Sequence, residues 1–156
     1  MAPEGCRGPG QLGMQTAIQH FERAIAKDPA YALAYAGLAD CYALISFFST
    51  VPPQESFPKL QAAASKALQI DDTLGEAHSA LGPYKEFYEW DWAGAEREHQ
   101  RALQLNPSYA VGHHRYAQYL LDVGRLEEAI QEAKRAQELD PVSLMISEWD
   151  SAMCTP

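Results

Sequence analysis

Apolar and small side chains recur three or four residues apart along most of the chain, which is the spacing of amphipathic α-helices. Four segments share an alanine that is followed by an Asp or Asn turn, and they superpose without gaps: FERAIAKDP, ASKALQIDD, HQRALQLNP and AKRAQELDP. The shared alanines, Ala24, Ala67, Ala102 and Ala136, are 43, 35 and 34 residues apart. The pattern therefore predicts an array of repeated helical units.

A second kind of segment, richer in tyrosine, lies between the first kind: YALAYAGLADCYAL, LGEAHSALGPYKEF and YAVGHHRYAQYLLD. We name these A segments and the alanine-rich ones B segments. Equivalent positions in a B segment and the next A segment are 21 residues apart in all three cases, whereas the distance from A to its own B is 22, 14 and 13 residues. The constant spacing predicts tight turns from B to A, and all length variation falls in the loop from A to B.

The repeat carries two motifs. Helix A of the first full unit has Y-x2-L-A-x2-Y, and the first helix B has A-x3-F-x2-A at Ala17, Phe21 and Ala24. This unit of about 34 residues resembles the tetratricopeptide repeat (TPR) over residues 14–141. The resemblance implies an all-α, right-handed superhelical stack of antiparallel helix pairs, an α-solenoid whose A helices line the concave surface.

The expected elements follow from the register. Residues 1–13 are expected to be a disordered or remnant N-terminal segment, and 142–156 a partial capping helix and tail. Between them we expect a lone B helix and three A/B pairs, at 14–27, 30–48 with 55–70, 74–88 with 92–105, and 109–122 with 126–139. Both ends look truncated. The segments AIAKDPAYALAYAGLADCYAL and WDWAGAEREHQRAL look like TPR arrays attached to bacterial signalling proteins, such as winged-helix regulators, receptor-type kinases and cyclases.

Prolines give two local expectations. The first A helix should extend past Ser46 by one or two turns and end before Pro52, and the next helix should start near Glu55 with Pro58 in its first turn, where a missing N–H costs nothing. Pro83 lies in the middle of an A segment and should kink that helix.

Charge and motifs exclude several functions. The chain has 12 Lys and Arg against 21 Asp and Glu, a net charge of −9, without a basic stripe for nucleic acid. The chain contains no apolar run of about 18 residues, the length that a membrane-spanning helix needs, so no membrane span is predicted. Three scattered cysteines fit a reducing cytoplasm, and the absence of catalytic and cofactor-binding motifs argues against an enzyme and predicts no cofactor.

Glu96 and His99 have the spacing of a di-iron ligand pair, but a second such pair is missing, so no metal site is expected. We interpret His78, His99 and His113 as hydrogen-bonded histidines of the core or of its boundary.

The concave rows are the candidate site. Carrying the A-helix face of the family onto this register selects residues at equivalent positions of the three units: Leu33, Ala36, Asp40 and Leu44; Glu76, Ser79, Pro83, Glu86 and Phe87; Val111, His114, Gln118 and Asp122. We expect this acidic and apolar groove to bind a neutral or basic peptide of a partner protein and to reject acidic tails, for which only Arg115 is suitable. Secondary contacts are expected at Phe47, Phe48 and Trp90.

Self-association is the alternative function. An unpaired B helix and an incomplete end expose apolar faces that a second copy could cover, so a homo-oligomer is possible through the terminal helices.

The two tryptophans of FYEWDWAGAEREH receive different interpretations. The positions equivalent to Trp92 are Met14, Phe57 and Leu126, all large and apolar, so Trp92 is expected to pack inside the hairpin. The counterparts of Trp90 are Glu55 and Gly124, and its role stays open between packing over the turn and contact with a ligand.

Stability measurements separate the two roles. Trp92→Ala should lower the free energy of unfolding by about 3–5 kcal/mol because it empties a core position, and Trp90→Ala should cost well under half of that. Urea titrations of both variants measure the difference. Equal losses would show that the repeat register is wrong at this turn.

Overall fold

The computed structural model describes residues 9–48 and 51–141, and these residues form helices and turns without any strand. Seven α-helices and one π-helical turn follow one another along the described part of the chain: α1 (Pro9–Lys27), α2 (Ala32–Phe48), α3 (Pro53–Ile70), α4 (Gly75–Tyr84), η2 (Lys85–Glu89), α5 (Trp92–Leu105), α6 (Ala110–Asp122) and α7 (Leu126–Leu139). The predicted all-α fold class is confirmed.

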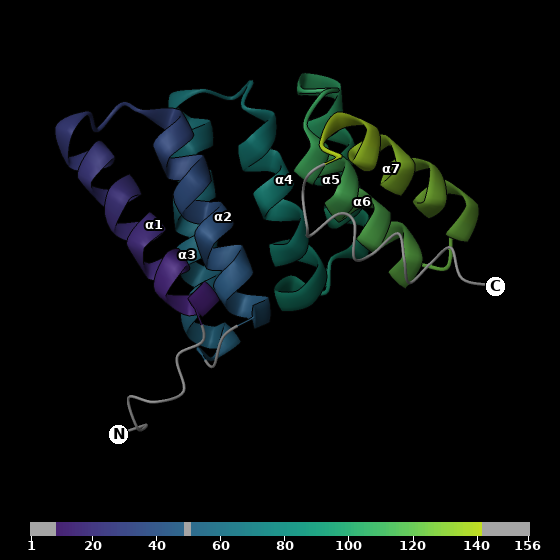
Figure 1. The fold of residues 1–156 in the computed structure, drawn as a ribbon, viewed down its shortest axis with the longest axis horizontal. Helices are drawn as coiled ribbons and strands as arrows, with labels where there is room; N and C mark the ends of the chain where they lie inside the picture. The colour runs from purple at the N-terminus through teal and green to yellow at the C-terminus, as the bar shows by residue number, and fades with distance from the viewer. Residues whose placement is uncertain (1–8, 49–50, 142–156) are drawn as a thin grey trace.

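The helices stack in order as antiparallel neighbours, as Figure 1 shows. The pairs α2 with α3, α4 with α5, and α6 with α7 are the A/B hairpins of the sequence, and α1 packs on α2. The last turns of the three A helices and the first turns of their B helices lie along one edge of the stack, the lower edge in Figure 1, which we call the A-to-B edge. Consequently residues at the ends of all three A helices share that edge.

Small residues set the distances between helices. Three of the four alanines that defined the repeat, Ala67, Ala102 and Ala136, are completely buried, whereas Ala24 on α1 is partly exposed. Ala39 and Ala64 are completely buried as well. Where one helix carries a ring, its neighbour carries glycine: a Cβ on Gly37 would lie 2.4 Å from the Cζ of Phe21. Close approach of this kind is the physical reason for the small residues of the pattern.

The helix boundaries match the register to the residue at α5 and α7 and differ by one to five residues at the other helices. α2 ends at Phe48, which is less than the expected one or two turns past Ser46. α1 begins at Pro9, so residues 9–13, which the register places outside the repeat domain, are helical; proline is favoured in the first turn because its missing N–H would have no helical partner. α3 begins at Pro53 for the same reason, which places Pro58 in the second turn rather than the first. The expected capping helix from about 142 lies outside the described residues.

The middle A helix responds to Pro83 by changing its winding. Pro83 cannot donate a hydrogen bond to the carbonyl of Ser79, and two residues later the helix becomes the π-helical turn η2. A π-turn accommodates one inserted residue, and the A-to-B distance here is one residue longer than in the third unit, 14 against 13. The helix thus ends in a π-turn, and the kink expected at Pro83 stays a prediction.

The position in the first turn of helix B that is equivalent to Trp92 differs in burial from one unit to the next. Phe57 is buried, Trp92 is partly buried against the cluster around Tyr119, and Leu126 is exposed. The expectation of packing is therefore met at Phe57, met in part at Trp92 and wrong for Leu126. Leu126 is the first residue of α7, where the described part of the chain places no further pair beside it.

Glycine at the close approach can be tested directly. Gly37→Ala should lower the free energy of unfolding by about 1–2 kcal/mol, because its Cβ overlaps the ring of Phe21. Gly13→Ala is the matched control: no atom lies within 4 Å of its Cβ, and it should stabilise by about 0.5–1 kcal/mol. In a Phe21→Ala background the penalty at Gly37 should vanish. An unchanged penalty would show that the ring does not limit the helix distance.

Candidate functional site

The A helices form the inner layer of the stack. α2 contacts α4 and α4 contacts α6 across the described residues, and these contacts are more extensive than any between successive B helices. Helices that lie closer together are on the inner side of a curved stack, so α2, α4 and α6 face the concave surface. The predicted rows of site residues come from these helices and from η2.

A polar bridge crosses this surface. The guanidinium of Arg115 on α6 donates to a carboxylate oxygen of Asp40 on α2 at 2.7 Å and to the hydroxyl of Ser79 on α4 at 3.3 Å. The hydroxyl of Tyr109 donates to the second carboxylate oxygen of Asp40 at 3.1 Å. Arg115 is buried, so the bridge joins all three A helices through one desolvated cation.

The thirteen predicted groove residues differ in accessibility. Five are buried, five are partly exposed and three are exposed. The buried ones are Ala36, Ser79, Pro83, Glu86 and His114; the partly exposed ones are Asp40, Leu44, Glu76, Val111 and Gln118; the exposed ones are Leu33, Phe87 and Asp122. The buried members can hold the groove in shape, whereas direct contact with a ligand falls to the other two groups.

Two of the four predicted groove acids, Asp40 and Glu86, add no free negative charge to this surface. Asp40 is paired with Arg115, and Glu76 accepts a hydrogen bond from the side-chain amide of Asn106 at 2.8 Å. Burial raises the pKa of Glu86 to about 8, with further contributions from a hydrogen bond and the charge of Asp122. Glu86 is therefore protonated at neutral pH, so the predicted groove is less acidic than its sequence indicates.

Glu86 is unusual among the groove residues because its side chain is only 2% exposed. Its Oε1 has no hydrogen-bond partner among the described residues. A buried carboxyl keeps its proton because the charged form would lose its hydration. Nothing in the local sequence signals this burial, which depends on the π-turn directing residue 86 toward α6.

Two histidines show opposite chemistry. His113 has an acceptor on each ring nitrogen, the carboxylate of Glu132 at 2.6 Å and the carbonyl of Pro107 at 2.9 Å. Burial alone would lower the pKa of His113, but these two hydrogen bonds outweigh it and raise the pKa. Both acceptors are satisfied only by the imidazolium.

His99 corrects the expectation of a hydrogen-bonded core histidine. It is buried, and neither ring nitrogen has a partner among the described residues. It packs against the rings of Tyr116 and Tyr119, with centroid distances of 5.8 and 5.6 Å. Burial, with a smaller effect of Arg115, lowers its pKa to about 3, so it is a neutral ring in the core.

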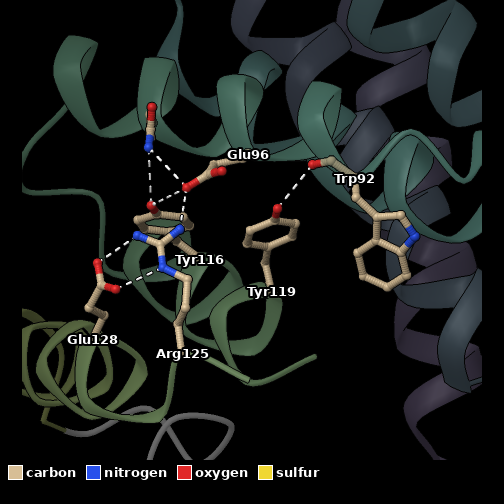
Figure 2. A network of polar contacts seen from close by, with 7 residues as sticks. Trp92, Glu96, Tyr116, Tyr119, Arg125 and Glu128 are labelled. Carbon is tan, nitrogen blue, oxygen red and sulfur yellow. Dashed lines mark hydrogen bonds and ion pairs between the residues drawn. The ribbon is translucent and has the colours of Figure 1, made fainter. Parts of the chain in front are cut away.

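The last two hairpins are tied together by Arg125, as Figure 2 shows. Its guanidinium lies between the carboxylates of Glu96 on α5 and Glu128 on α7. The Tyr119 hydroxyl donates to the carbonyl oxygen of Trp92 at 3.0 Å. These contacts fix the start of α5 relative to α6.

Glu96, one of the two residues with di-iron spacing, forms an ion pair with Arg125. Over residues 9–48 and 51–141 no three His, Cys, Asp or Glu side chains are grouped to hold a metal ion.

Four exposed aromatic side chains lie at the A-to-B edge. Phe47 at the end of α2, Phe87 and Tyr88 in η2, and Trp90 after η2 are all exposed, and we name these four residues the aromatic lobe. The rings of Phe47 and Phe87 meet edge to face with centroids 5.2 Å apart. Phe48 ends α2, and its side chain lies outside the described part. Of the predicted secondary contacts, Phe47 and Trp90 thus share one edge.

Trp90 adopts a left-handed backbone conformation with a φ of 58°. In the next unit the equivalent residue is Gly124, with a φ of 79°, which closes α6 with hydrogen bonds from Arg125 to Leu120 and from Gly124 to Leu121. A bulky residue in this conformation costs about 1–2 kcal/mol relative to glycine. The alignment of Trp90 with Gly124 is visible in the sequence and is the signal that could have predicted this strain.

The fold is that of tetratricopeptide repeat arrays. Similar solved structures include TTC0263, a thermophilic TPR protein of Thermus thermophilus, with a TM-score of 0.70, 18% identity, and coverage of 92% of this chain and 75% of that one. The first TPR of Spaghetti (RPAP3) bound to the HSP90 peptide SRMEEVD has a TM-score of 0.58 and 20% identity, covering 78% and 89%. MamA has a TM-score of 0.57 and 18% identity, covering 98% and 84%.

Sequence comparisons add no closer relative, since no protein-family model and no curated protein matches the chain. The structural likeness at these identities establishes the fold. No helix among the described residues has both the length and the apolar character required to cross a membrane.

The stability of the fold should depend on pH through Glu86. Its folded pKa lies above the ordinary value of 4.5, so its contribution is complete below pH 4.5 and is lost as the pH rises through about 8. One pKa unit corresponds to about 1.4 kcal/mol, which puts the loss on the order of 3 kcal/mol after relaxation of the buried group. Urea titrations between pH 4.5 and 9 should show this decline, and Glu86→Gln should flatten it.

His113 provides the control because its window differs. Its folded pKa is raised above 6.5, so its contribution is present below pH 6.5 and is lost as the pH rises further. His113→Gln should therefore change the slope only above about pH 6.5. A Glu86→Gln variant with the wild-type slope between pH 4.5 and 6.5 would contradict the burial of a protonated carboxyl.

Proposed function

We propose that this chain is a non-catalytic interaction scaffold that binds a peptide segment of a partner protein along the concave face of α2, α4 and α6. The observation that carries the proposal is the Arg115–Asp40 bridge. It holds the three A helices at fixed positions while exposed or partly exposed side chains such as Leu33, Val111 and Gln118 remain on the same helices. A preformed surface of this kind reduces the entropy lost on binding.

The chemistry of the surface favours a neutral or basic peptide with apolar anchors. Arg115 is buried and already paired with Asp40, so it offers little to an incoming carboxylate. Only Asp122 among the four predicted groove acids is exposed. The TPR of RPAP3, by contrast, is bound to the acidic peptide SRMEEVD, and we infer that the groove of this chain selects against that kind of ligand.

Self-association is a second candidate, and exposed apolar residues near the ends of the described stack favour it. Tyr31 lies before α2, and Val123 and Leu126 lie at the turn into α7. A second copy that covered them would bury apolar area. Light scattering distinguishes self-association from peptide binding, because a protein that stays monomeric at high concentration does not self-associate.

The cytoplasmic location and the attachment to a bacterial signalling protein stay proposals. They rest on the composition and on the narrower resemblance of the sequence. Copurification with a full-length parent protein would test the second of them.

Calorimetry tests the groove. A twelve-residue peptide of alternating Lys and Leu should bind at least tenfold more tightly than SRMEEVD, because the groove offers apolar contacts and its arginine is already paired. The double variant Leu33→Ser with Val111→Ser should weaken the Lys-Leu peptide about tenfold through lost apolar burial.

Leu126→Ser is the matched control for this test. Leu126 is 55% exposed and Leu33 is 50% exposed, but Leu126 lies at the start of α7, outside the groove. The control should keep the wild-type affinity. Tighter binding of SRMEEVD, or an equal loss in both variants, would show that the concave face is not the recognition surface.

A further inference from the structure

The turn between η2 and α5 presents an indole on a rigid backbone. Trp90 is 70% exposed, the highest value among the large apolar side chains of the described residues. Its contact with a neighbouring ring is a tilted one with Trp92, at a centroid distance of 6.5 Å. Packing over the turn, one of the two roles left open by the sequence, accounts for little of this side chain.

Hydrogen bonds hold the backbone around Trp90 from both sides. The N–H of Asp91 donates to the carbonyl of Lys85 at 2.9 Å, and the Asp91 side chain accepts from the N–H of Gly94 at 2.8 Å, which caps α5. Two residues after Trp90, the carbonyl oxygen of Trp92 accepts a hydrogen bond from the Tyr119 hydroxyl. The exposed indole is therefore presented by a backbone that is already ordered, as binding anchors commonly are.

The strain at this turn is specific to one unit. In the third unit the closing bond runs from Arg125 to Leu120, whereas here it runs from Asp91 to Lys85 and encloses one more residue. Glycine fills the left-handed position there and would relieve the strain here. A strained, exposed tryptophan at a π-turn is a feature that folding does not require, and such outliers occur most often at binding sites.

The charges beside the indole define the partner. Lys85 Nζ lies 3.1 Å from a carboxylate oxygen of Glu89 and 3.9 Å from one of Asp91, so two acids share one lysine and the rim keeps one negative charge. A second copy would bring the same acidic rim and a net charge of −9. The lobe suits a peptide that carries a cation instead.

We propose that Trp90 and the rest of the aromatic lobe form an anchor site for a peptide segment with an aliphatic or aromatic residue next to Lys or Arg. The apolar residue covers Phe47, Phe87 and Tyr88, and the cation stacks on the Trp90 indole beside Glu89. The inference deepens the proposed function, since it places one end of the bound peptide at the A-to-B edge.

The deciding variant is Trp90→Gly. Glycine fits the left-handed conformation, as Gly124 does, so the urea midpoint should equal or exceed that of the wild type. The affinity for the Lys-Leu peptide should fall at least tenfold in calorimetry. Leu126→Ser again serves as the control for loss of an exposed apolar side chain at the same edge. A purely structural role for Trp90 predicts the reverse, a lower midpoint with unchanged affinity, and would overturn the inference.

Fluorescence provides a readout that stability does not affect. The chain has three tryptophans, and in a Trp92→Phe, Trp149→Phe background the emission comes from Trp90 alone. The Lys-Leu peptide should shift the emission to shorter wavelength and halve its quenching by acrylamide. An unchanged spectrum at saturating peptide would overturn the anchor site.

The outcomes separate the anchor from the groove. If Leu33→Ser with Val111→Ser weakens binding and Trp90→Gly does not, the groove proposal stands and the anchor is wrong. If only Trp90→Gly weakens binding, or both variants do, the anchor is supported. If neither does, both proposals fail. A wild-type dimer that Trp90→Gly converts to monomer would show that a second copy covers the lobe, and this would also overturn the inference.

Discussion

The close approach of helices at alanine and glycine is the constraint from which the other features of this structure follow. A completely buried alanine such as Ala67 or Ala102 lets a B helix lie against its neighbour with backbone almost in contact. Where a ring intervenes, as at Phe21, a glycine opposite makes the room. These distances repeat with the sequence, so the A helices come near enough for a side chain of the third unit to reach the first. Arg115 and Asp40 are 75 residues apart and still form an ion pair.

That ion pair changes what the concave face can do. An arginine in a peptide-binding groove is expected to attract carboxylates, but a buried arginine with an internal carboxylate partner is a structural tie. Protonation removes a second negative charge at Glu86, whereas the hydrogen bond from Asn106 orients the Glu76 carboxylate without neutralising it. For the proposed peptide binding, selectivity would then depend on apolar shape and on the edges of this surface, where charged and aromatic side chains are exposed.

The sequence was sufficient for the elements and insufficient for the site. Alanine spacing is a local property, and it predicted α5 and α7 to the residue. Partners from distant units are not encoded in local spacing, so the pairing of Asp40 and the burial of Glu86 and His99 could not be foreseen. Pro83 predicted a disturbance of the middle A helix, but the form that it takes, a π-turn after the proline, was not predicted. The predicted start of α1 at residue 14 was wrong, because the repeat register does not extend before that residue, whereas the helix begins at Pro9.

Pro83, η2 and Trp90 are consecutive consequences of one insertion. The proline leaves the Ser79 carbonyl without its helical donor, and the extra residue is absorbed by widening the winding after it. The wider turn must still reverse direction into α5, which requires a left-handed residue at position 90. Glycine would satisfy that requirement without strain, as it does at Gly124. Tryptophan at this position costs backbone stability and buries little of its own surface, so packing within the described residues does not account for it, whereas the proposed anchor site would.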